Sequence, residues 1–104
     1  MALTTKEIKK YRRIGHSLQP VVTLAEQGLS EGVQLELERA LNDHELIKIR
    51  VNCNDREAKL ALISEICATC RCEIVQKIGK VALLYRPGKE PNPRLSNLLR
   101  FKLR

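Results

Sequence analysis

Three cysteines that lie close together in the sequence could bind a metal ion or react with one another. Cys67, Cys70 and Cys72 form a CxxC and a CxC pattern, and Cys53 and His44 are further candidate ligands. Structural zinc needs four ligands, of which a CxxC supplies two, and the sequence holds no second CxxC and no HxxxH. Cys67 and Cys70 also fall on the apolar side of an expected helix, where cysteine packs as a small hydrophobic residue. We therefore expect core packing and no cofactor, and keep a metal-binding or thiol-switch protein as the alternative function.

The segment around Gly28 and Ser30 could bind a phosphate group. Ser30 is a typical N-cap residue, and Glu31 follows it in the expected first turn of a helix. The free backbone N–H groups at a helix N-terminus, together with the helix dipole, favour a bound anion. Gly28, which has no side chain, would let the protein backbone approach the phosphate closely. A tight turn alone also explains a glycine at this position.

Residues suited to catalysis are few. His16 and His44 are far apart in the sequence, and neither belongs to a nucleophile motif. Residues 43–45 read DHE, but they lie where an expected helix gives way to a strand, so a polar turn explains them. The sequence has no P-loop, dinucleotide fingerprint or HExxH motif. We expect a protein that is not an enzyme and has no small-molecule substrate.

The charge of the chain is concentrated at its two ends. Nineteen basic and twelve acidic side chains give a net charge of +7 and a pI near 9.5. Residues 1–24 hold five basic side chains against one acidic, residues 86–104 hold six against one, and the middle is slightly acidic. Clustered positive charge favours a polyanionic partner, either a nucleic acid or an anionic membrane surface.

The basic residues that we expect to contact a nucleic acid come from several segments. Aromatic residues are scarce, so we expect recognition of the backbone and shape of a structured nucleic acid, without base stacking on a sheet. The expected contact residues, including the two from the phosphate-binding segment, are Lys6, Lys9, Lys10, Arg13, Gly28, Ser30, Lys48, Arg50, Lys80 and Arg86.

The elements that must position these residues follow the hydrophobic periodicity. Helices are predicted over about 5–14, ending at Gly15, over 30–42 and over about 55–69. Strands are predicted over 21–24, 46–51, 73–77 and 81–85, the last two forming an antiparallel hairpin. The order αβαβαββ predicts an α/β domain with a mixed sheet and helices packed against it.

The domain organisation and compartment follow from length and composition. A chain of 104 residues has room for one domain, which we place at residues 1–87. Residues 88–104 contain prolines followed by a basic stretch and are predicted to form a flexible tail that becomes helical on a partner. No signal peptide pattern or apolar stretch long enough for a membrane span is visible, so we expect a cytoplasmic monomer without membrane association.

Three segments resemble a known family. Residues 20–33 (PVVTLAEQGLSEGV), 44–49 (HELIKI) and 78–87 (IGKVALLYRP) are similar, in order and spacing, to the YhbY-type CRM domain, the chloroplast RNA splicing and ribosome maturation module. The likeness covers about residues 3–87 and is to the stand-alone bacterial form.

The resemblance implies a fold and a function. The fold is a two-layer α/β domain with a four-stranded mixed sheet and three helices, similar to the C-terminal domain of translation initiation factor three. The function is RNA binding, with association with precursors of the large ribosomal subunit and a role in ribosome assembly. The family has a GxxG loop after its first strand, similar to the backbone-clamping loop of KH domains. This chain departs from that pattern, since Ala25 replaces the first glycine and Glu26 lies inside the loop, where it should repel phosphate.

The sequence therefore favours an RNA-binding protein of the ribosome assembly pathway. Two alternatives stay open beside it. One is the metal-binding or thiol-switch protein built on the three clustered cysteines, and the other is a docking module whose basic face meets an acidic protein.

Overall fold

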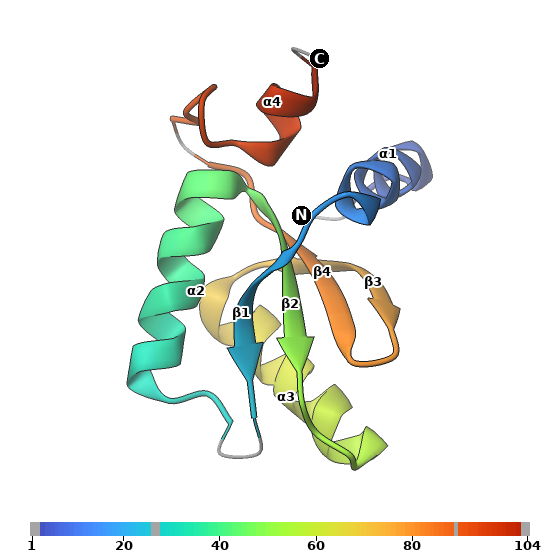
Figure 1. Ribbon diagram of the computed structural model, residues 1–104, viewed down its shortest axis with the longest axis vertical. Coiled ribbons are helices and arrows are strands. Elements are labelled where there is room, and N and C mark those ends of the chain that lie inside the picture. The colour runs from blue at the N-terminus through green and yellow to red at the C-terminus, as the bar shows by residue number, and fades with distance from the viewer. Residues whose placement is uncertain (1–2, 26–27, 89, 103–104) are drawn as a thin grey trace.

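A computed structural model of the chain describes residues 3–25, 28–88 and 90–102, without the side chains of 100–102. Its elements run through the chain in the predicted order with one addition, a short helix near the C-terminus (Figure 1). Their bounds are α1 Thr5–His16, β1 Pro20–Leu24, α2 Glu31–His44, β2 Leu46–Val51, α3 Arg56–Cys70, β3 Glu73–Ile78, β4 Val81–Tyr85 and α4 Asn97–Lys102.

The four strands form one mixed sheet in the order β1-β2-β4-β3. β1 runs parallel to β2, while β4 is antiparallel to both β2 and β3. A parallel pair needs a crossover connection, which α2 supplies, and the hairpin between β3 and β4 needs only a tight turn at Gly79 (φ 56°). The predicted four-stranded mixed sheet is thereby confirmed.

One face of the sheet carries the main hydrophobic core. Apolar residues of α2 and α3, such as Leu37, Leu41 and Ile66, pack against Ile47 and Ile49 of the central strand β2, and all five side chains are inaccessible to solvent. These helices and the sheet form the two layers that the α/β assignment predicts (Figure 1).

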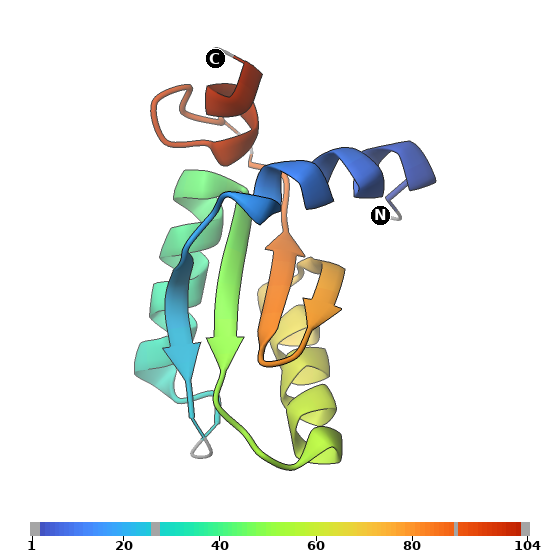
Figure 2. The ribbon, with the colours of Figure 1, turned by 45° about the vertical axis from the view of Figure 1, so that its right-hand side comes forward.

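The opposite face is covered at one end only. α1 crosses it there, as Figure 2 shows, and buries Tyr11 and Ile14 against Leu46, Leu83 and Tyr85 of the sheet. Further down the same face no helix lies over the strands (Figure 2). A large part of one sheet face therefore stays accessible, which is unusual for an α/β domain and matters for the site described below.

The predicted end of the first helix at Gly15 is wrong. α1 continues to His16, and Gly15 lies within it against β4. A Cβ atom at Gly15 would lie 2.5 Å from Cδ2 of Leu83, so this glycine is present for close packing and does not terminate the helix. The helix begins where the sequence predicts, at Thr5, and Thr4 and Glu7 form a capping box there.

The segment predicted to be a flexible tail packs on the domain where it is described. Ser96 is fully buried, and its hydroxyl donates to Oε1 of Glu45 at 2.7 Å. Asn97 donates through Nδ2 to the carbonyl oxygen of Leu46 at 2.7 Å, and Leu98 joins the core beneath α1. Sequence periodicity misses these contacts because they are made by single residues, outside any amphipathic pattern, and α4 is a fourth helix beyond the three predicted.

We expect Ser96→Ala to destabilise the fold by about 1–3 kcal/mol, because the Glu45 carboxylate, 6% exposed, loses one of its hydrogen-bond donors. Gly88 N–H would remain its partner, at 2.8 Å from Oε2. Urea denaturation checks the value, with Ser64→Ala on the exposed side of α3 as the matched control. A Ser96→Ala protein as stable as its parent would show that the segment is not held by this contact.

Two tyrosines in contact should make stability fall at alkaline pH. The rings of Tyr11 and Tyr85 lie 4.8 Å apart between centroids, and burial raises the pKa of both hydroxyls above the ordinary value. Because the pKa of each tyrosine is higher in the folded state than in the unfolded state, the two neutral hydroxyls contribute their full share to stability below about pH 10. That contribution is lost as the pH rises further and the hydroxyls ionise. The chain has two tyrosines and no tryptophan, so tyrosinate absorbance reports these two groups alone. If both tyrosines of the folded protein titrated with the ordinary pKa of a tyrosine, this expectation would be contradicted.

Candidate nucleic-acid interface

The solvent side of α1 carries a row of basic residues. Five basic side chains and one acidic side chain lie between Thr5 and His16. Four of the basic ones, spaced three or four residues apart, share one side of the helix, and all are exposed; they are Lys6, Lys9, Lys10 and Arg13. No ion pair within the described residues neutralises these four. Glu7 is engaged by Thr4, whose hydrogen bonds hold the pKa of the Glu7 carboxyl below its usual range.

The sheet adds two cations on the same side of the molecule. Lys48 stands opposite Leu83 and Arg50 opposite Val81 in the antiparallel ladder between β2 and β4. Residues directly opposite each other in a ladder point to the same face, and Leu83 packs beneath α1. Lys48 and Arg50 therefore lie on the open part of the α1 side of the sheet, and the structure brings them to the same side as the basic residues of α1.

Lys80 and the Gly28 loop lie at the other end of the sheet. Val51 N–H donates to the Lys80 carbonyl at 2.7 Å, and Asn52 N–H donates to the Leu24 carbonyl at 2.7 Å. These bonds place the β3–β4 turn and the end of β1 beside the end of β2, whereas α1 packs against the start of β2 (Figure 2). The predicted contact residues thus reach from one end of the sheet to the other and do not form a single compact cluster, and Gly28 lies beside Leu62 of α3, on the face opposite α1.

The loop after β1 has less capacity to clamp a phosphate than its sequence predicts. Gly28 adopts φ 80°, which favours glycine, and its N–H already donates to the Ala25 carbonyl at 3.0 Å. The hydroxyl of Ser30 accepts from Val33 N–H at 3.2 Å, as expected for the N-cap of α2. Glu26 and Gln27, which the sequence places inside the loop, lie outside the described residues.

Arg86 does not lie with the other predicted contact residues. Its guanidinium is 17% exposed and forms an ion pair with Glu38 of α2, Nη1 to Oε2, at 2.7 Å. It also donates to the Cys70 carbonyl at the end of α3 and to Oδ1 of Asn42, both at 2.8 Å. Arg86 therefore joins α2, α3 and β4 on the covered face of the sheet, and its contacts are structural.

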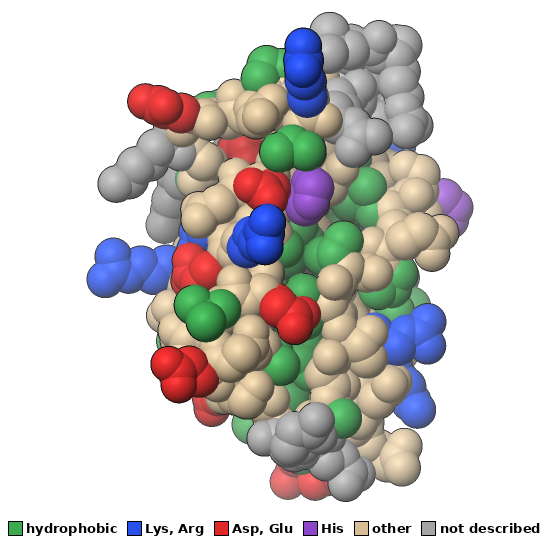
Figure 3. Space-filling model, turned by 60° about the vertical axis from the view of Figure 1, so that its left-hand side comes forward, with side chains coloured by type: hydrophobic (Ala, Val, Ile, Leu, Met, Phe, Trp, Pro, Cys, Tyr) green, Lys and Arg blue, Asp and Glu red, His purple; other side chains and the backbone are tan. Residues whose placement is uncertain are grey.

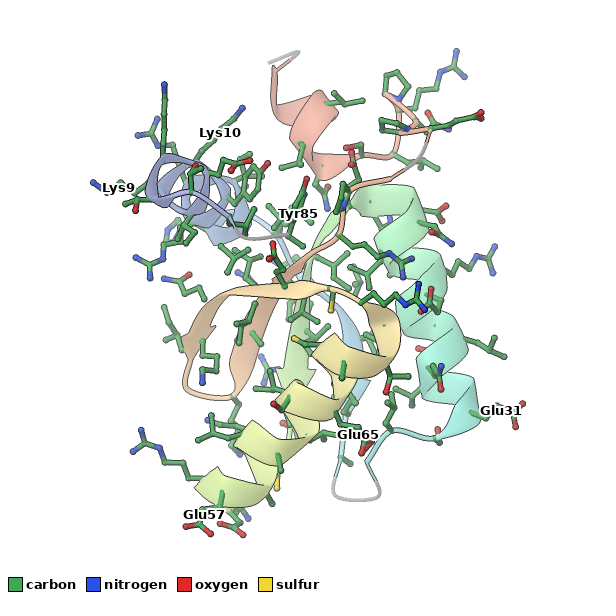
Figure 4. The ribbon with its side chains drawn as sticks, turned by 180° about the vertical axis from the view of Figure 1, so that it is seen from behind. Lys9, Lys10, Glu31, Glu57, Glu65 and Tyr85 are labelled. Atoms are coloured by element: carbon green, nitrogen blue, oxygen red, sulfur yellow. The ribbon has the colours of Figure 1, made fainter. Side chains whose placement is uncertain are left out.

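The two helices on the surface away from α1 carry more acidic than basic side chains. Exposed glutamates of α2 and α3 lie there, namely Glu31, Glu36, Glu57 and Glu65. Figure 4 shows Lys9 and Lys10 projecting from α1 at one end, with Glu31, Glu57 and Glu65 on the two helices at the other, and Figure 3 shows acidic side chains spread over the side of α2. A polyanion is therefore attracted to one side of the domain and repelled by the other.

The clustered cysteines are part of the core. Cys70 and Cys72 are buried, and Cys67 packs at the edge of the same core. Burial raises the pKa of the Cys70 thiol to about 11, and a hydrogen bond from the Cys72 thiol lowers the pKa of Cys67. Among the described residues no group of three or more His, Cys, Asp or Glu side chains is placed to hold a metal ion. The core packing predicted for these residues is what the structure shows.

His16 is a candidate that the sequence analysis missed. It follows Arg13 by three positions and continues the exposed basic side of α1. Helical spacing identifies His16 once the helix extends beyond Gly15. His16 lies at the edge of the open sheet face, beside Lys48.

The family model for the CRS1/YhbY (CRM) domain matches residues 3–86. The chain belongs to the CRS1/YhbY (CRM) domain family. A relative in Pseudomonas aeruginosa named "Probable RNA-binding protein" is 54% identical over 101 residues, 97% of each chain. An "RNA-binding protein" of Haemophilus influenzae is 46% identical over 88 residues, which cover 85% of this chain and 89% of the relative.

The fold of this CRM domain also has a counterpart among solved structures. The solution structure of a candidate RNA-binding protein of Staphylococcus aureus matches with a TM-score of 0.74 and 30% identity, over 86% of this chain and 93% of that one. The family membership and the fold predicted from residues 20–33, 44–49 and 78–87 are both confirmed. No described helix of the CRM domain is long and apolar enough to cross a bilayer.

Proposed function

We propose that this CRM domain binds structured RNA through the basic side of α1 and the adjoining cations of β2. The observation that carries the proposal is the set of six cations that one side of the domain presents without a neutralising partner among the described residues: Lys6, Lys9, Lys10, Arg13, Lys48 and Arg50. Relatives named as RNA-binding proteins support the choice of RNA as the polyanion.

The far end of the same side offers a second, weaker contact. Lys80 would meet RNA that extends along the open sheet from α1. The Gly28–Ser30 segment lies at the same end of the sheet but beside Leu62 of α3, so RNA would reach it only around the end of the domain. The N–H group of Gly28 already donates a hydrogen bond within the loop, so it does not clamp a phosphate. This segment would contribute through the N-terminus of α2, whose helix dipole attracts a phosphate. Arg94 adds positive charge near the C-terminal segment, and Lys89 and Arg104 lie outside the described residues.

The RNA that we propose as the target is the precursor of the large ribosomal subunit in the cytoplasm. The protein would act on it as a monomer and assist assembly, without making or breaking a covalent bond. An RNA held by phosphate contacts on one face of a small domain can still fold on its other sides, which suits an assembly role. The acidic helices on the opposite side would keep a second RNA segment away.

Sedimentation of a gentle lysate on a sucrose gradient tests this assignment. We expect the protein to migrate with particles at or just below the large subunit and to leave them at high salt, because phosphate contacts release counterions. Recovery of the protein only at the top of the gradient, even at low salt, would contradict the ribosomal target. Nuclease treatment before sedimentation is the control, since contacts made to protein alone would survive it.

A further inference from the structure

A small hollow lies on the open sheet face, next to the C-terminal end of α1. Its volume is about 240 Å³. Leu83 and Val81 of β4 and Ile78 of β3 provide its apolar surface, while His16, Lys48 and Gln76 provide its polar rim. Six side chains from α1 and three strands therefore meet around one site, on the side of the domain proposed to bind RNA.

The hollow lies where α1 ends over the sheet. Gly15 lets the helix backbone lie directly on Leu83, which is 3% exposed. Beyond that contact the helix ends, and the sheet continues without cover. Ile78 is 64% exposed at the edge of the hollow, which leaves apolar surface in contact with water.

The rim groups have hydrogen-bonding capacity that the protein does not use. Within the described residues no side-chain hydrogen bond or ion pair engages His16, Lys48 or Gln76. Gln76 can donate and accept through its amide, and an imidazole offers a flat ring for stacking. An apolar floor with a polar rim suits a planar heterocycle whose faces are apolar and whose edge carries donors and acceptors.

The charges around the hollow indicate what the heterocycle is attached to. Lys48 lies on the rim and Arg50 lies two residues along β2 on the same face, so a phosphate linked to the ring would meet a cation on the sheet. Three other hollows on the domain are each lined by at least one glutamate, Glu65, Glu73 or Glu38. Among these four hollows, this one alone has no acidic side chain in its lining, so it would attract a phosphate most strongly.

We propose that this hollow holds a single unpaired base of the bound RNA, with its phosphates on Lys48 and Arg50. The inference rests on the proposed RNA-binding function and adds to it a preference for a helix with a bulged nucleotide over a fully paired one. Moving a base out of an RNA helix costs little free energy when that base is already unpaired. The free energy gained by burying the base in the hollow is therefore largely retained as affinity.

Two RNA hairpins with the same stem and loop, one of which carries a single additional bulged nucleotide in its stem, test the proposal. We expect the protein to bind the bulged hairpin about tenfold more tightly, in line with burial of one base against the apolar floor of the hollow, which Ile78 helps to form. The double variant Gln76→Ala, Ile78→Ser should reduce this ratio to about one while leaving affinity for the paired hairpin unchanged, since it removes no charge. Ile78 is exposed and outside both core clusters, so the variant should fold.

Ile74→Ser is the matched control. Ile74 lies on the same strand and is 37% exposed, but it pairs with Leu84 and therefore points to the opposite face of the sheet. This control should keep the preference for the bulged hairpin. Equal binding of both hairpins by the parent protein, or a variant that weakens both equally, would overturn the pocket and leave RNA binding in place. Binding of neither hairpin would overturn the proposed function together with the pocket.

Discussion

Reversing three charges on α1 is expected to abolish most of the RNA affinity while the domain stays folded. The substitutions Lys9→Glu, Lys10→Glu and Arg13→Glu change exposed side chains that make no ion pair within the described residues, so little native packing is removed. Each basic side chain that no longer meets a phosphate should lower the slope of log affinity against log salt by about one, and the combined decrease in affinity at physiological salt should be on the order of 100-fold. Filter binding or fluorescence anisotropy across a salt series measures both quantities, and circular dichroism confirms folding.

The control for this variant must change the charge by the same amount elsewhere. Arg39→Glu, Arg56→Glu and Lys77→Glu alter three exposed cations away from the basic side of α1, and both triple variants lower the net charge from +7 to +1. We expect the control to lose only the long-range part of the attraction, within about a few-fold, because screening weakens charges beyond about 10 Å. Equal decreases in affinity in the two variants would mean that net charge, and not the α1 face, determines binding.

Removing Arg86 is expected to have the opposite profile, with a large effect on stability and little on RNA affinity. Arg86→Leu leaves Glu38, the Cys70 carbonyl and Asn42 without a shared donor where α2, α3 and β4 meet. Since Glu38 is 35% exposed and can be partly solvated, we expect a loss of about 2–3 kcal/mol and not the full cost of a buried charge. That corresponds to a fall in Tm of roughly 10–20 °C.

Arg39→Leu is the matched control for Arg86→Leu. Arg39 lies on α2 beside Glu38 but is exposed, so the same chemical change should alter stability by no more than about 0.5 kcal/mol. RNA affinity of the Arg86→Leu protein, measured well below its Tm, should equal that of the parent. A selective decrease in RNA affinity without a change in stability would show that Arg86 contacts RNA after all.

The regular elements could be predicted from the sequence because each depends on local patterns. The alternation of Ile47, Ile49 and Val51 with Lys48 and Arg50 indicates both the strand and the separation of its cations from its core residues. The capping box at Thr4 and the N-cap at Ser30 locate two helix starts within a residue.

Features that depend on contacts between distant residues could not be predicted. A basic residue after a strand gives no sign that it will pair with Glu38, which lies 48 positions away, so sequence patterns place Arg86 among the surface cations. Gly15 has the composition of a helix end, and only the position of Leu83 shows why a glycine is needed there. Ser96 looks like a residue of a solvated tail until the buried Glu45 carboxylate is located.

The candidate site divides in the same way. The spacing of Lys6, Lys9, Lys10 and Arg13 predicts a shared helix face, and the structure brings them together. The opposition of this face to the acidic side of α2 and α3 depends on how the helices pack on the two faces of the sheet. The hollow between α1 and the open strands depends on that packing too, so sequence patterns could not reveal it.

The most direct test of the proposed interface is a titration of isotope-labelled protein with a structured RNA hairpin, followed by backbone amide chemical shifts. If the basic side of α1 binds RNA, the largest changes will fall on residues 6–16 and 48–50, and the exposed sides of α2 and α3 will change little. The largest changes on Glu31–His44 or Arg56–Cys70, with α1 unaffected, would contradict this interface.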